Sequence, residues 1–132
     1  MIGRLGDEEI LLRRIHPTNM RGEGGTRPSS NAFEDSGDGS PMSVYVESII
    51  LRLGYQPIDV LSGYPSHGLV SFTVGLIREL DWDAILRGGT PGDPFGDAHS
   101  AVVGDKSPRP PRKRLALECD IRHWPSTNGI AT

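Results

Sequence analysis

The sequence predicts a small single domain of the α+β class, residues 1–132, with a few short strands, two or three helices and long irregular loops. Three observations support this prediction. The length of 132 residues suits one domain. Some stretches alternate apolar and polar residues, as strands do, and others repeat apolar residues at helical spacing. Finally, 17 glycines and 11 prolines indicate a modest core with long connections.

The first apolar run, residues 7–16, fits two kinds of element. A helix starting near Asp7 would place the acidic residues in its first turn and two arginines in its last turn, as the helix dipole favours. A strand through 10–15 is nearly as well supported, because a short apolar run does not decide the type. Pro17 ends either element, since it can neither continue a helix nor donate to a strand ladder.

Residues 18–41 are rich in Gly, Ser, Pro, Asn and Asp and predict a long polar loop that can hold one short turn around Phe33. Loops longer than about 12–15 residues are uncommon unless they are functional or disordered. The length of this loop is therefore the main reason to look for a site here.

Residues 42–54 form the strongest predicted element. Their first part alternates, with Ser43, Tyr45 and Glu47 on one face of a strand. The second part carries apolar residues at helical spacing, with Leu53 among the expected core positions and Gly54 as the stop. A short strand that runs into a helix explains both patterns.

The rest of the chain is divided by its turn residues. Pro57 and Pro111 each suit the start of a helical segment, and the alternation over 68–74 is rich in strand formers. The expected order is a helical turn at 57–63, a strand at 68–74, a helix through Leu80, an extended segment at 84–86, a loop at 88–97, a strand at 98–104, a loop at 105–111, a helix at 111–124 and a loose tail at 125–132.

Charge and cysteine content restrict the function classes. The net charge of -3 is too small to indicate a general nucleic-acid binder. A single cysteine excludes an internal disulfide framework and suits a reducing compartment. No apolar run approaches about 18 residues, and the N-terminal segment is too charged for a signal peptide. We expect a cytoplasmic protein away from membranes, and the many Arg and Gly residues suggest a bacterial one.

Five polar residues lie in or just before the long loop and suit the binding of an anion. Arginine and hydroxyl donors beside a glycine-rich backbone can hold a phosphate or carboxylate. The lysine of a phosphate-binding P-loop is missing. The alternative is a solvated surface loop. We expect Arg27→Ala to weaken binding and to leave the melting temperature nearly unchanged. The candidates are Arg14, His16, Arg27, Ser29 and Ser30.

Tyr45 and His99 are further candidates because each adjoins the end of a predicted strand, where functional groups often lie. Arg or His, Ser and Tyr on strand ends suit a compact nucleotide- or NAD-using transferase with chemistry like that of ADP-ribosyltransferases. Ser43 and Glu47 would belong to such a set if residues 42–47 form a strand. The alternative is that Tyr45 packs at the edge of the core.

Two further features carry less weight. Cys119 and His123 are spaced i, i+4 on the predicted last helix, but one such pair is too few ligands for zinc, and we expect no metal or cofactor. The basic stretch could contact a nucleic-acid backbone, although no aromatic residues lie among its cations to stack on bases. These cations are Lys106, Arg109, Arg112, Lys113 and Arg114.

Two functions are consistent with these features. The first is an accessory or interaction protein that contacts a partner protein, a second copy of itself or a phosphate-bearing ligand such as a nucleotide through its polar loops. The second is the compact transferase. The first explains the modest core, the long loops and the lack of a specific catalytic motif.

Overall fold

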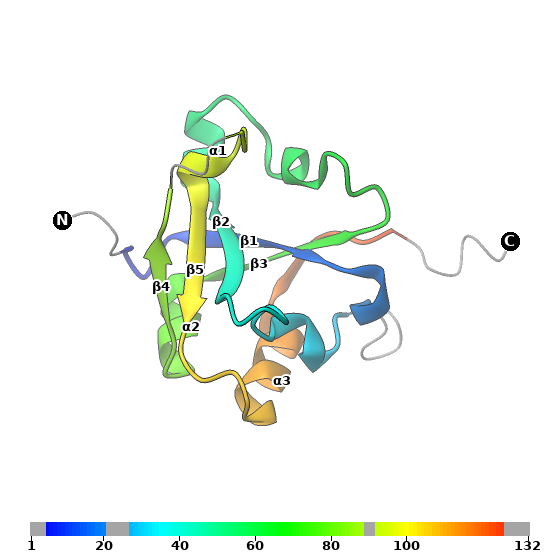
Figure 1. Ribbon diagram of the computed structural model, residues 1–132, viewed down its shortest axis with the longest axis vertical. Coiled ribbons are helices and arrows are strands. Elements are labelled where there is room, and N and C mark those ends of the chain that lie inside the picture. The colour runs from blue at the N-terminus through cyan, green and yellow to red at the C-terminus, as the bar shows by residue number, and fades with distance from the viewer. Residues whose placement is uncertain (1–4, 21–26, 89–91, 126–132) are drawn as a thin grey trace, which may run out of the picture.

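A computed structural model of the protein describes residues 5–20, 27–88 and 92–125. Within them the chain forms one antiparallel sheet in the order β4-β5-β2-β1-β3-β6 (Figure 1). The strands are β1 (Ile10–Ile15), β2 (Met42–Val46), β3 (Gly68–Thr73), β4 (Asp83–Leu86), β5 (His99–Val103) and β6 (Asp120–His123). The helices are α1 (Glu47–Arg52), α2 (Val74–Glu79) and α3 (Arg109–Glu118). Short 3-10 turns are η1 (Pro17–Asn19), η3 (Ser30–Phe33), η4 (Pro57–Leu61) and η5 (Gly96–Ala98). The predicted α+β class is confirmed.

The strand β1 lies in the interior of the sheet and organises it. Leu12 pairs with Tyr45 of β2 on one side and with Ser71 of β3 on the other. The sequence left a helix or a strand open for this segment. Residues 10–15 form the strand, which gains hydrogen bonds to a neighbouring strand on each side. Leu11 and Leu12 are both completely buried, on opposite faces of the sheet. Each such side chain stabilises the fold by about 1.5–3 kcal/mol.

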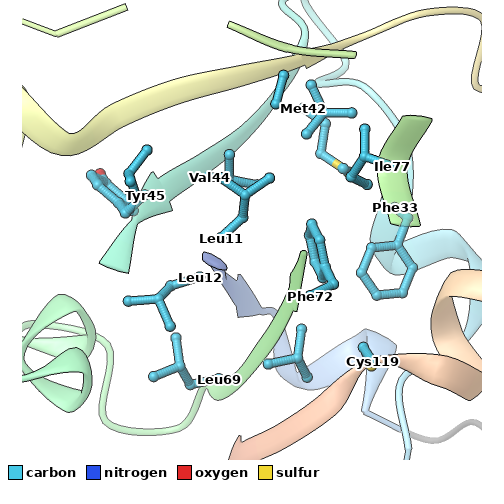
Figure 2. Packing of buried hydrophobic residues seen from close by; sticks show 14 of the residues in the cluster. Leu11, Leu12, Phe33, Met42, Val44, Tyr45, Leu69, Phe72, Ile77 and Cys119 are labelled. Carbon is cyan, nitrogen blue, oxygen red and sulfur yellow. The ribbon is translucent and has the colours of Figure 1, made fainter. Parts of the chain in front are cut away.

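Each face of the sheet has its own cover. On one face, Phe33 of η3 meets Phe72 edge to face, and Cys119 lies nearby at the end of α3 (Figure 2). On the other face, Leu12 and Leu69 lie beside the 3-10 turn η4 (Figure 2). The sheet is thus the middle layer of the domain.

The predicted change from strand to helix within 42–54 is confirmed, since β2 ends at Val46 and α1 begins at Glu47. The expected core position of Leu53 is wrong. Its side chain is 39% exposed, whereas Ile50 is completely buried. The helix is only six residues long, so Leu53 already lies at its C-terminal end, beyond the turn that packs on the sheet.

The C-terminal helix expected at 111–124 is also different. It begins earlier, at Arg109, which shortens the loop predicted at 105–111, and it ends at Glu118. The chain then becomes β6, which pairs with the open edge of β3. The backbone hydrogen bonds between β6 and β3 stabilise this strand, and they join segments far apart in the chain, so the local sequence does not predict them.

Several predicted segments reach residues outside the described ranges. These are part of the long loop, residues 21–26, part of the loop at 88–97, residues 89–91, and most of the predicted tail, residues 126–132. In the described ranges, none of the helices has both the length and the apolar character needed to span a bilayer.

Candidate functional site

Polar side chains form a row across β1, β2 and β5 on the face that η4 partly covers. The guanidinium carbon of Arg14 lies 5.0 Å from the centre of the Tyr45 ring. The Tyr45 ring is 5.7 Å from that of His99 on the other side. The register explains the second contact, because Tyr45 and His99 are directly paired across β2 and β5. Three residues predicted from sequence are therefore brought together.

Arg14 is held in place at one end of this row. Its Nε donates to the carbonyl of Val60 across 2.6 Å, and its guanidinium lies 4.1 Å from the centre of the Tyr64 ring. Neighbouring Arg13 points to the opposite face, as strand alternation requires. Its Nη1 donates to the carbonyl of Ser43, which fixes the backbone of β2 next to the row.

A β-bulge places a further arginine at the other end. The backbone N–H groups of Arg87 and Gly88 both donate to the carbonyl of His99, each across 2.9 Å. Two residues opposite one is the signature of a bulge, which redirects the side chains beside it. Gly88 has φ +58, a conformation that favours glycine. The bulge thus fixes Arg87 next to His99.

These elements surround a hollow of about 350 Å³, a size within the range of small-molecule sites. Nε2 of His99 lies 3.2 Å from the Ser43 hydroxyl oxygen inside it. The lining residues are Ser40, Pro41, Ser43, Arg87, His99 and Ala101. An arginine, a histidine and a serine therefore border one space.

Burial, the largest cause, lowers the pKa of His99, and the positive charges of Arg87 and Arg14 lower it further. Asp93 opposes this shift in the pKa of His99. The imidazole is therefore neutral at pH 7. Burial also raises the pKa of Tyr45, so its phenol remains protonated. The free hollow consequently carries the charge of Arg87 without that of His99.

Asp93 anchors the loop beside the hollow. One of its oxygens accepts from the backbone N–H of Phe95 at 2.9 Å, and the other accepts from the Tyr45 hydroxyl at 3.4 Å. The Phe95 ring packs against Tyr45 and Tyr55. The carboxylate is thus already engaged and does not neutralise Arg87 by direct pairing.

His16 lies apart from the hollow, at the end of β1. Its Nδ1 accepts from the backbone N–H of Thr18, and its ring is 5.2 Å from that of His67. The Tyr64 ring lies 5.0 Å from His67 on another side. Burial, His16 and Arg14 together lower the pKa of His67. Arg14 therefore links two separate groups of side chains.

Two of the three candidates from the long loop, Arg27 and Ser30, contact α3. Arg27 donates from Nε to the carbonyl of Ala116 at 3.0 Å and from Nη2 to that of Cys119. Ser29 precedes η3, and the carbonyl of Ser30 lies 3.4 Å from a guanidinium nitrogen of Arg112. These contacts hold the segment that leads into η3 against α3, and none of the three residues lines the hollow.

Most of the basic stretch is paired internally. Lys106 is buried, donates to Asp35 and to two backbone carbonyls, and lies over the Trp82 ring. The ion pairs are Lys106–Asp35, Arg112–Glu34, Arg114–Glu79 and Arg114–Glu118. Within the described ranges this leaves Arg109 and Lys113 without a carboxylate partner. The stretch therefore offers a nucleic acid far less charge than its composition suggests.

Cys119 and His123 do not share a helix, because Cys119 caps α3 and His123 lies in β6. The spacing that suggested a pair of metal ligands is lost. Burial raises the pKa of the Cys119 thiol to about 11. In the described part of the chain, no three His, Cys, Asp or Glu side chains gather as a metal site would require.

Sequence reasoning missed Arg87 and Asp93. For Arg87 a signal was present, because an arginine followed by two glycines directly after an apolar strand is typical of a bulge or turn. For Asp93 the signal was weaker, as it stands among turn residues. Comparisons with known protein families, curated proteins and solved structures find no match to this chain.

Proposed function

We propose that this chain is a binding protein, an accessory or interaction module that holds the anionic group of a ligand in the hollow between β2, β5 and the end of β4. The observation that carries the proposal is the convergence of Arg87, His99 and Ser43 on one space. An exposed guanidinium with adjacent hydroxyl and imidazole groups can supply several hydrogen bonds to a phosphate or a carboxylate.

The charges around the hollow support an anion over a cation. Of the charges that act on His99, Asp93 has the largest influence and raises its pKa, and Arg87 and Arg14 have smaller influences that lower it. Arg14 and Asp93 have partners of their own. In the described ranges Arg87 has no ion pair, so its charge is available to a ligand.

The transferase alternative receives less support. Its residue set included Glu47, whose carboxylate pairs with Arg122 of β6. Its histidine, His16, packs against His67 at the end of β1. Of that set, only Arg14 and Tyr45 belong to the polar row, and Ser43 lies beside it. We therefore propose binding without group transfer.

The experiment is isothermal titration of the purified protein with phenyl phosphate and with benzoate, in buffers free of phosphate. We expect binding of at least one of these anions, and we expect Arg87→Gln to abolish it. Arg109→Gln is the matched control, because Arg109 is an arginine outside the hollow. Equal affinity in the wild type and Arg87→Gln, or no binding of either anion, would contradict the proposal.

A further inference from the structure

The hollow contains one permanent cation and one group that can become a cation. Arg87 is charged at any physiological pH. His99 lies beside it, since the Arg87 backbone is hydrogen-bonded to the His99 carbonyl. Both residues line the same hollow as Ser43 of β2. An anion that contacts both would meet either one positive charge or two.

Every charged or titratable group that acts on His99 belongs to a different element. Arg14 comes from β1, Tyr45 from β2, Arg87 from the end of β4 and Asp93 from the loop before η5. Arg14 and Asp93 have partners in the protein, so neither needs to move when a ligand enters. The charge of the ligand is then the one that is added near the imidazole of His99 on binding.

The charge of the ligand decides the protonation of His99. A negative charge within a few ångströms favours the protonated imidazole. A carboxylate carries one charge, which Arg87 alone can match. A phosphate monoester carries about 1.5–2 charges at pH 7 and presents three acceptor oxygens. It therefore gains from a second cation and leaves an oxygen for the Ser43 hydroxyl.

We infer that the hollow is specific for a phosphate monoester, which binds as the dianion between Arg87 and a protonated His99, with a proton taken up on binding. This inference rests on the proposed function. No bond in the ligand is made or broken, and the proton comes from the solvent. The Ser43 hydroxyl, which faces Nε2 of His99 in the free protein, turns its proton to a phosphate oxygen.

The test is titration calorimetry at pH 7 in two phosphate-free buffers of different ionisation enthalpy, which reports the protons taken up. Phenyl phosphate and benzoate serve as probes that share a ring and differ in their anionic group. We expect phenyl phosphate to bind about tenfold more tightly, since a hydrogen bond to a charged group is worth at least that factor. Net proton uptake should accompany phenyl phosphate and be absent with benzoate.

His99→Gln keeps a polar side chain beside Ser43 and cannot be protonated. We expect this variant to lose both the proton uptake and the preference for phosphate. His67→Gln is the matched control, because His67 also has a lowered pKa and lies outside the hollow. It should retain both properties.

The outcomes separate the two proposals. If both anions bind through Arg87 with equal affinity and without proton uptake, the phosphate specificity is wrong and the anion site stands. Uptake that persists in His99→Gln also overturns the role of His99. If neither anion binds to the wild type, the anion site itself is wrong.

Discussion

The guanidinium of Arg27 holds the C-terminal end of α3, donating from Nε to the carbonyl of Ala116 across 3.0 Å. The last carbonyls of a helix have no partner within it. A second hydrogen bond reaches the carbonyl of Cys119, where the chain leaves α3 for β6. An arginine that the sequence suggested for ligand binding thus stabilises a junction 89 residues away.

We predict that Arg27→Ala lowers the free energy of unfolding by about 1.5–3 kcal/mol, the usual contribution of hydrogen bonds to a charged group. Thermal denaturation of the variant checks this. Arg52→Ala is a suitable control, because that arginine is exposed on α1. An unchanged melting temperature would restore the sequence-based expectation that Arg27 is free to bind a ligand.

A pair of substitutions tests the placement of the core. Ile50→Ala should destabilise the protein by about 2–5 kcal/mol, because it opens a cavity beneath α1. Leu53→Ala, three residues further on, should cost only about 0.5 kcal/mol, as is usual for surface positions. Urea denaturation of both variants measures the difference. Equal losses would show that Leu53 packs in the core after all.

Buried Lys106 gives a third prediction. Its ammonium group donates to the Val102 and Gly104 carbonyls and pairs with Asp35 at 2.9 Å. Lys106→Met should destabilise by about 3 kcal/mol, at the low end for breaking a buried ion pair, because Asp35 keeps some contact with water. Adding Asp35→Asn to Lys106→Met should recover part of this loss. A double variant that is less stable than Lys106→Met would contradict the pairing.

Stability should fall as the pH drops below about 6.5, the ordinary pKa of histidine. Burial lowers the pKa of both His67 and His99 in the folded protein. Between the folded and unfolded pKa values the unfolded chain binds more protons, so acidification favours unfolding. Urea denaturation at pH 7.5 and pH 5 measures this loss. The double variant His67→Gln/His99→Gln should lose less stability over this interval, and an identical loss would contradict the assignment.

The bulge at Gly88 gives a prediction for binding. A side chain at φ +58 costs about 1–2 kcal/mol, so Gly88→Ala should relax the bulge and move Arg87. We expect phenyl phosphate to bind several-fold more weakly. Gly54→Ala, at φ +93 in open space, carries similar strain away from the hollow and should leave the affinity unchanged. Equal effects of the two substitutions would show that the bulge does not position Arg87.

The parts of the fold that could be predicted were those whose pattern is local. The alternation over 42–46 and the helical spacing that follows it both report the surroundings of their own residues, and the change from strand to helix was predicted correctly from them, although Leu53 at the end of the helix is exposed. The end of α3 could not be found in this way. Residues 120–123 become a strand because they pair with the edge of β3. The sequence of residues 120–123 carries no sign that this edge is open.

The same distinction applies to the candidate site. Tyr45 and His99 could be proposed because each stands at a strand end, and their contact followed once β2 and β5 paired. Arg87 was missed because its importance arises from a bulge opposite His99. Arg27 looked free because its partners are backbone carbonyls, which composition and spacing do not reveal.

Cys119 provides a built-in reporter of local opening. It is the single cysteine of the chain, and it is buried beneath the junction that Arg27 holds. Burial raises the pKa of this thiol to about 11, so the folded junction keeps it in the unreactive thiol form. Labelling by a thiol reagent therefore requires a local opening in which α3 and β6 separate, and its rate reports that opening. The exposure of this one thiol to solvent can thus be followed while the rest of the sheet stays folded.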